Sequence, residues 1–311
     1  MARAPKVTWD RVATLIAAGH GSGLDEFYQP ILQIKRWNTS PVSVQVVETL
    51  PPFRRRCHFF SYSEYHMALL FSWAGALIRE QFPAWPWPHF HPEHGRNFED
   101  DALLARSPGM IKICRDAGIG HGTFVGTDIP YIWSIDLCLT LPWIEVPAQR
   151  TVLASIKPLD SDRYQHIDPL DRGPEKLEGE RRYARQLGVG YIVADRTRYV
   201  GQLFANLDLY RRAATLAPNS PLATARHQLL AGHADDLQAQ PITDSIRLAA
   251  EACDISHANA TALVHHCLWT QIIDCDLSRE IHHAKPPLPG GRRLRQAIRD
   301  VLTQHALGSA R

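Results

Sequence analysis

The 311-residue sequence lacks the signatures of several classes of protein. Its six cysteines never form a Cys-x-x-Cys pair, so we expect neither a zinc finger nor disulfides, and scattered cysteines in a reducing compartment behave as small apolar side chains. No apolar run approaches the roughly 20 residues that a membrane-spanning helix needs, and the N-terminus has no apolar segment of signal-peptide length. We therefore expect a cytoplasmic protein with no membrane partner.

A large surplus of one charge is also missing. The sequence has 34 Lys and Arg against 32 Asp and Glu, a net charge of +2, whereas non-specific nucleic-acid binders usually carry a strong basic surplus. The total is an average, however, because residues 285–311 hold six basic residues and one acid, and residues 1–60 hold eight and four. The near-neutral total therefore does not exclude DNA; it indicates weak affinity for DNA by the chain alone.

Residues 1–200 show the alternation of strands and helices that is typical of an α/β domain. Ser61 or Ser63 is a suitable cap for a helix that ends at Gly75. Residues 131–141 and 151–158 read as two strands, a helix opens at Pro174 and closes at Gly188, and residues 189–194 read as a buried strand. This order predicts a hairpin followed by a crossover helix and a further strand.

The remainder of the chain is rich in helical patterns. Residues 246–252 and 259–273 predict a helix-turn-helix with its turn at 254–256. Residues 272–277 alternate apolar and polar side chains and predict a strand, which would make this a winged helix. Contact with DNA and plain packing are equally compatible with this motif.

The two central strands bring an acid and a lysine together. If they form an antiparallel hairpin centred near Val146, residues whose numbers sum to about 293 lie opposite each other, so Asp136 faces Lys157. Directly opposed Cβ atoms lie about 5 Å apart. Ser155 shares the face of Lys157, and a metal held by Asp136 would lie within reach of the lysine ammonium group.

An acid on a helix, a second acid on a strand and a lysine on the next strand are typical of metal-dependent nucleases of the restriction-endonuclease fold. Here they would be Glu64, Asp136 and Lys157. Carboxylate oxygens bind Mg²⁺, which polarises a scissile phosphate and lowers the pKa of an attacking water. A lysine orients that water or stabilises the developing charge. We expect Glu64 and Asp136 to bind Mg²⁺, with Mn²⁺ as a substitute.

Further strings accompany these residues in a fixed order: IREQFP at 78–83, SID at 134–136, SIKP at 155–158 and EKLEGERRY at 175–183. The ordered set, over roughly residues 15–200, resembles the TnsA family, the endonuclease subunit of heteromeric cut-and-paste transposases. The resemblance implies a Mg²⁺-dependent endonuclease that cuts the 5′ strand at each transposon end. A partner transposase of the RNase H-like type would cut and join the 3′ ends.

The resemblance also assigns residues. Glu64 and Asp136 match the family's metal-binding acids, and Lys157 matches its catalytic lysine. Ser155 stands where the family has glutamine, and a serine hydroxyl is a shorter and weaker metal partner, so we expect Ser155 to be at most a helper in catalysis. Glu180 matches a charged helix position near the family's active site. The other charges of that helix have the spacing of intrahelical ion pairs.

The resemblance implies partners as well: double-stranded DNA at the transposon ends, the transposase, and an AAA+ regulator ATPase, assembled on a bacterial nucleoid. The glycine-rich segment 19–23 lacks the Lys-Ser/Thr of a P-loop, so nucleotide hydrolysis must come from another protein. We predict a restriction-endonuclease-like α/β domain over residues 1–200 and a helical, winged-helix domain over 201–311 for DNA and partner binding.

Other interpretations stay open from the sequence. A stand-alone nuclease of the same fold would cut without partners, and a non-catalytic DNA-binding or bridging module would never cut. Lys157 and Asp136 also form a plausible ion pair without metal. His89, His91 and His94 are a weaker candidate for a zinc site, because they lie in a proline-rich segment without the ligand spacing of known zinc motifs.

Overall fold

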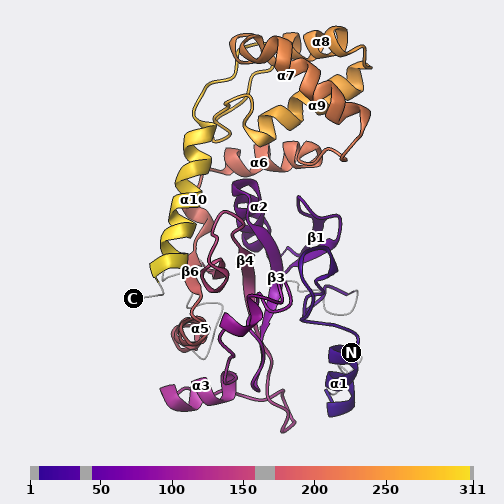
Figure 1. Ribbon diagram of the computed structural model, residues 1–311. Coiled ribbons are helices and arrows are strands. Elements are labelled where there is room, and N and C mark those ends of the chain that lie inside the picture. The colour runs from indigo at the N-terminus through magenta and orange to yellow at the C-terminus, as the bar shows by residue number, and fades with distance from the viewer. Residues whose placement is uncertain (1–6, 36–43, 158–171, 309–311) are drawn as a thin grey trace, which may run out of the picture.

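The computed structural model describes residues 7–35, 44–157 and 172–308, which form an α/β part at one end and a helical part at the other (Figure 1). The α/β part contains α1 (Trp9–Ala17), β1 (Val46–Thr49), β2 (Arg56–Phe59), α2 (Tyr62–Ala74), β3 (Leu77–Ala84), α3 (Met110–Ala117), β4 (Trp133–Thr140), β5 (Thr151–Ile156), α5 (Gly173–Leu187) and β6 (Gly190–Ala194). The helical part contains α6 (Gly201–Tyr210), α7 (Pro221–Ala239), α8 (Ile242–Cys253), α9 (His257–Thr270) and α10 (Gly291–Gly308). Among these residues no helix combines the length and the apolar character needed to cross a membrane.

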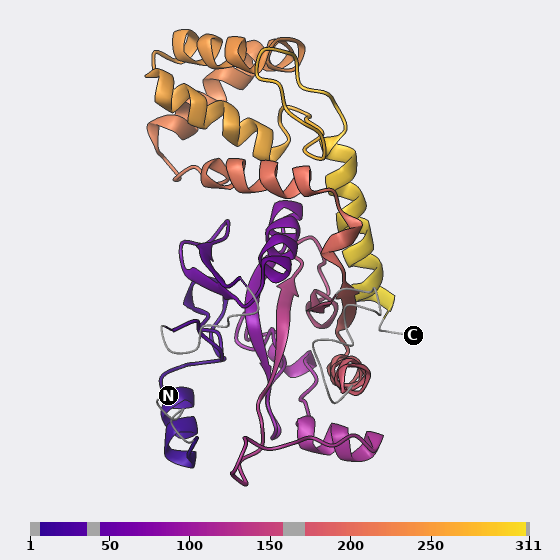
Figure 2. The same ribbon diagram turned by 180° about the vertical axis from the view of Figure 1, so that it is seen from behind.

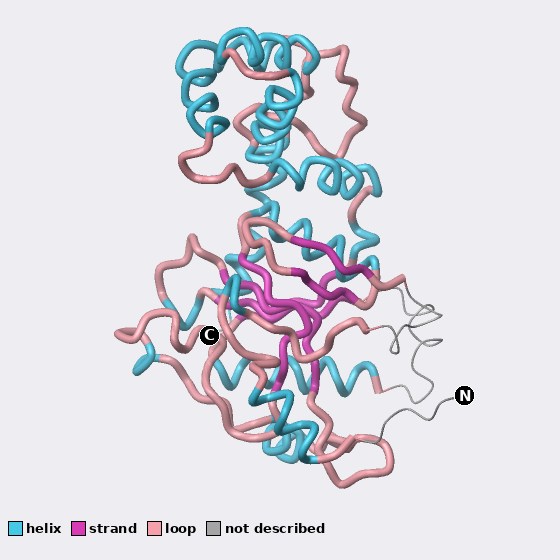
Figure 3. The backbone as a smooth tube through the Cα atoms, turned by 90° about the vertical axis from the view of Figure 1, so that its right-hand side faces the viewer, coloured by secondary structure: helices cyan, strands magenta, loops and turns pink. Residues whose placement is uncertain are grey.

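The main sheet has the strand order β3-β4-β5-β6 and is mixed, which confirms the α/β class. β4 pairs antiparallel with both β3 and β5, while β6 pairs parallel with β5. The helix α5 connects β5 to β6 and ends at Gly188 in the left-handed conformation, as the sequence predicted. The strands lie in the middle of the α/β part, as the side view shows (Figure 3).

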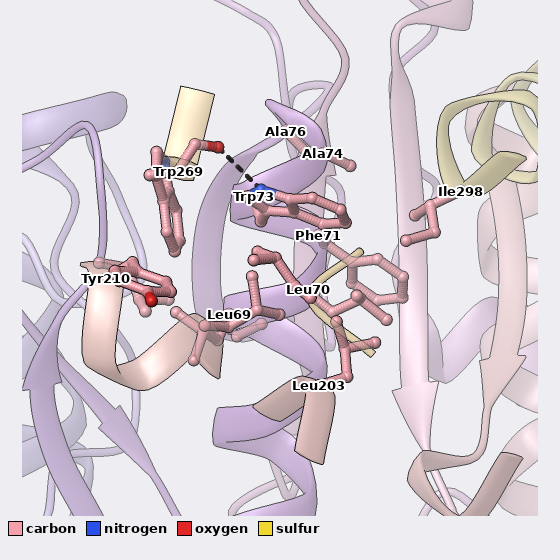
Figure 4. Packing of buried hydrophobic residues seen from close by; sticks show 14 of the residues in the cluster. Leu69, Leu70, Phe71, Trp73, Ala74, Ala76, Leu203, Tyr210, Trp269 and Ile298 are labelled. Carbon is pink, nitrogen blue, oxygen red and sulfur yellow. Dashed lines mark hydrogen bonds between the residues drawn. The ribbon is translucent and has the colours of Figure 1, made fainter. Parts of the chain in front are cut away.

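The helix α2 lies at the centre of the largest hydrophobic cluster. Ser61 caps its start and Gly75, with φ 101°, ends it, which confirms both predicted ends. Its side chains contact residues of α6, α9 and α10 as well as the sheet (Figure 4). The indole nitrogen of the fully buried Trp73 donates to the carbonyl oxygen of Trp269 at 2.9 Å, and Figure 4 shows this bond between α2 and α9. The two regions that the sequence separates as domains therefore share one core.

The predicted wing strand is wrong. The helix-turn-helix is present as α8 and α9, but residues 272–277 form a loop, and no strand occurs between residues 201 and 308. Two amides of this loop bond to side chains, and those of Ile273 and Asp276 bond to the carbonyl oxygens of Cys267 and Leu288. Gln238 accepts from the amide of Asp274 at 2.7 Å, and Gln271 accepts from the amide of Cys275 at 3.1 Å.

The last helix runs back from the helical part to the edge of the sheet (Figure 2). It packs on β6, where a Cβ atom built on Gly190 would lie 2.8 Å from the carbonyl oxygen of His305. The backbone of α10 therefore lies against the backbone of β6, and only glycine, which has no Cβ atom, leaves room for this contact. Because the opposing atoms are backbone, they cannot move aside as a flexible side chain would.

We expect Gly190→Ala to lower the free energy of unfolding by about 1–3 kcal/mol, the usual cost of overpacking a close contact. Urea denaturation measures this. Gly201→Ala is the matched control, because nothing lies within 4 Å of a Cβ atom at that position, and its effect should be neutral or slightly stabilising. Equal stability of the two variants would show that α10 is not held against β6.

Candidate functional site

Glu64 lies in the first turn of α2, where the cap of the helix fixes its side chain. The hydroxyl of Ser61 accepts from the Glu64 amide at 3.1 Å, and the Glu64 carboxylate accepts from the Phe60 amide at 2.9 Å and from Ser61 at 3.1 Å. This reciprocal arrangement is close to a capping box. Glu64 is 9% exposed, so its capping role and its buried position together hold the carboxylate in one place.

Gln81 holds the same carboxylate from the sheet. The β3–β4 ladder pairs Glu80 with Leu137 and Phe82 with Ile135, so it keeps one register across Gln81, which lies opposite Asp136 with a φ of 48°. Its side-chain nitrogen donates to Glu64 Oε2 at 2.9 Å, and its oxygen accepts from the Ser134 hydroxyl at 2.7 Å. The sequence reasoning missed Gln81, because it is the last of three consecutive polar residues of β3, after Arg79 and Glu80, and nothing in the string separates it from them.

Asp136 and Lys157 meet, but in a different register from the predicted one. The β4–β5 ladder places Leu137 opposite Ala154, so the paired numbers sum to 291 rather than 293 and the same register puts Asp136 opposite Ser155. Lys157 lies one residue beyond β5. A shift by two residues keeps a side chain on the same face, and Lys157 Nζ donates to Asp136 Oδ2 at 2.8 Å. The amide of Ile156 donates to the same oxygen at 2.7 Å.

Ser155 bonds to a different carboxylate. The Ser155 hydroxyl donates to Glu180 Oε2. The Tyr191 hydroxyl donates to the Ser155 oxygen and to Glu180 Oε2, at 3.0 Å each. Glu180 is fully buried on α5, and Lys176 Nζ lies 3.8 Å from its other oxygen. Tyr191 was not recognised from the sequence, because its closeness depends on the parallel pairing of β6 with β5.

The charge of Asp136 affects the pKa of two other buried acids. Burial and the nearby charge of Asp136 raise the pKa of Glu64 to about 7. Burial and, to a lesser extent, Asp136 also raise the pKa of Glu180. Burial alone would lower the pKa of Lys157, but the charge and hydrogen bond of Asp136 outweigh it and raise that pKa, so the lysine stays cationic. A bound cation would offset the negative charge of such a group of acids.

Two polar residues of the string IREQFP have structural partners outside this group. Arg79 Nη2 lies 2.7 Å from Glu93 Oε1, and Glu80 lies 2.8 Å from Arg55 Nη2, both pairs being buried. The string therefore combines two buried ion pairs with Gln81, which contacts Glu64. On α5, Glu178 pairs with Arg181 and Arg182 at 2.6 Å each, as the helical spacing predicted.

The three histidines of the proline-rich segment do not converge. His89 Nε2 bonds to Tyr183, His91 Nδ1 accepts from the amide of Glu93, and His94 lies 3.2 Å from Asp101. No three His, Cys, Asp or Glu side chains within the described ranges are arranged to share an ion.

For Mg²⁺ the relevant groups are therefore the pair Glu64 and Asp136. Both oxygens of Glu64 and one of Asp136 accept hydrogen bonds, and Asp136 Oδ1 has no protein donor among the described residues. Hard oxygens in small number suit Mg²⁺, which keeps several waters when bound to proteins. The mutual repulsion of the two acids also fits a cation between them.

Comparison with protein-family models and with curated protein sequences finds no match to this chain.

Proposed function

We propose that the chain is a Mg²⁺-dependent DNA endonuclease with a restriction-endonuclease-like fold, acting as the TnsA-type subunit of a transposase. One observation supports this above the others: Glu64 and Asp136, from a helix and a strand, are buried close enough for Asp136 to raise the pKa of Glu64, and Lys157 bonds to Asp136. The sequence resemblance supports the transposase context, with double-stranded transposon ends, an RNase H-like transposase and an AAA+ ATPase as partners. The helical part would bind DNA or these partners.

The chain's own groups suit phosphodiester hydrolysis. When bound, Mg²⁺ supplies polarisation of the phosphate and a more acidic attacking water. Asp136 holds the ammonium group of Lys157 beside the two acids, where the lysine orients the water or stabilises the charge that develops on the phosphate. Gln81 and the Phe60 amide hold the Glu64 carboxylate in position near Asp136 and Lys157. Burial keeps the site's electrostatic interactions strong.

A cleavage assay on plasmid DNA that carries the transposon ends tests the proposal. The purified chain is incubated with Mg²⁺, alone and with its cognate transposase and ATPase. We expect 5′-strand cuts at the ends only in the complete mixture. Cutting by the chain alone would indicate a stand-alone nuclease, and DNA binding without cutting in any mixture would indicate a bridging module.

Ser155→Ala is expected to reduce the single-turnover cleavage rate less than about ten-fold, the order of one lost neutral hydrogen bond. Its hydroxyl already donates to Glu180 and accepts from Tyr191, and Tyr191 also donates directly to Glu180 and can continue to do so. Tyr191→Phe is the matched control for the same cluster. A loss comparable to that of an Asp136 variant would instead make Ser155 a direct participant.

A further inference from the structure

A cavity of about 580 Å³ lies between the start of α2 and α6, and nothing in the proposed hydrolysis uses it. Its lining includes Tyr62 and His66 from α2, Arg196 from the turn after β6, and Phe204 and Asp208 from α6. Tyr62 is 50% exposed, so an aromatic face is open to a ligand. The cavity thus lies between the α/β part and the helical part.

The aromatic rings in this cavity are stacked. His66 lies over Phe204 with the ring centroids 4.7 Å apart and an interplanar angle of 11°, and Tyr62 lies over His66 at 5.4 Å and 28°. The guanidinium group of Arg196 lies 5.2 Å from the centre of the Phe204 ring. A row of parallel rings that ends in an exposed tyrosine is a surface on which another flat ring stacks.

Arg196 adds a cation to the cavity. Its Nε bonds to His66 Nδ1 at 2.9 Å, and its terminal nitrogens donate to no other group in the described part of the chain. The acid in the cavity is partly neutralised, because Asp208 Oδ1 accepts from Tyr65 and from Arg211 Nε. A ring together with an anion, the chemistry of a nucleotide, complements these groups.

The cavity adjoins the candidate site through two elements. The amide of Lys157 donates to the carbonyl oxygen of Ala194 at 3.0 Å, and Arg196 follows Ala194 by two residues. Tyr62 lies in the same first turn of α2 as Glu64. The cavity and the candidate site therefore adjoin each other along the chain, at the start of α2 and at the ends of β5 and β6.

We propose that the cavity binds the base of a nucleotide next to the cleaved phosphodiester, unstacked from the duplex and placed on Tyr62, with its phosphate near Arg196. The proposal deepens the proposed nuclease function and rests on it. Unstacking a base gives access to a backbone that a closed duplex shields, and an aromatic platform offsets the lost stacking.

The test measures binding without cleavage. The full-length chain with Asp136→Asn, in EDTA, is titrated by fluorescence anisotropy with a labelled dT12 and with a labelled 12-mer of abasic deoxyribose phosphates, which has the same phosphates and no bases. We expect dT12 to bind about ten-fold tighter than the abasic strand. Adding Tyr62→Ala should remove this difference, and Tyr62→Phe, which keeps the ring, should preserve it.

Arg196→Ala should weaken both strands, because it removes a phosphate contact. Thermal melting confirms that each variant is folded. Equal binding of dT12 and the abasic strand by the Asp136→Asn chain would overturn the proposal, as would a preference for dT12 that survives Tyr62→Ala. Because this readout needs neither metal nor cutting, a failure of the nuclease function itself would appear separately, as absent cleavage by the wild-type chain.

Discussion

Asp136→Asn is expected to lower Mg²⁺-dependent cleavage of transposon ends at least about 1,000-fold while leaving the fold intact. Asparagine has the same shape, and its oxygen can still accept from the Ile156 amide, which lies 2.7 Å from the aspartate oxygen. The change removes the negative charge that Mg²⁺ needs and that keeps the Lys157 ammonium group in place. Single-turnover cleavage in the reconstituted assembly measures the rate, and calorimetric titration with Mg²⁺ measures metal binding.

Asp116→Asn is the matched control. Asp116 also pairs with a lysine, Lys112 at 2.7 Å, but this pair is exposed on α3 and away from the candidate site. Losing this ion pair should leave cleavage and metal binding unchanged, since exposed ion pairs contribute little to stability. Undiminished cleavage by Asp136→Asn would show that the assigned site is wrong, whatever the behaviour of the control.

The local features of the α/β part could be predicted because each depends on short stretches of sequence. Ser61 and Gly75 mark the ends of α2 by capping chemistry, and Pro174 and Gly188 frame α5 in the same way. The hairpin of β4 and β5 was predicted from its pattern, but its register was not. Residues 147–149 form a turn of 3-10 helix, and the loop closes where the Leu141 amide donates to the Arg150 carbonyl oxygen.

The candidate site could be predicted in part for the same reason. Asp136 and Lys157 belong to one hairpin, and their contact tolerates the error in register because a shift by two residues preserves the face. The contacts of Gln81 with Glu64 and of Ser155 with Glu180 each join a strand to a helix, and neither lies within a hairpin. They depend on the φ of 48° at Gln81 and on the packing of α2 and α5 against the sheet, which the pattern of the strands does not predict.

Glu93→Gln is expected to lower the free energy of unfolding by about 3–5 kcal/mol, the cost of breaking a buried ion pair. Glu93 joins three strands, since it pairs with Arg79 of β3 and accepts from Thr140 of β4 at 2.7 Å and from Thr151 of β5 at 3.2 Å. The variant leaves the buried Arg79 guanidinium without its anion. Urea denaturation measures the loss. Glu178→Gln, which affects two partly exposed ion pairs on α5, should cost no more than about 1 kcal/mol.

The pH dependence of this loss identifies its cause. Burial would raise the pKa of Glu93, but the charges of Arg79 and Arg96 outweigh burial and lower it. A carboxyl group with a lowered pKa stabilises the folded state above its unfolded pKa of about 4.3, and this contribution disappears as the pH falls through the folded value. The stability gap between wild type and Glu93→Gln should therefore be constant from pH 7 to about 5 and shrink below about 4. The amide and the protonated acid are nearly equal in size, so a loss of charge alone predicts that the gap disappears at low pH. A gap independent of pH would indicate that the variant disturbs packing.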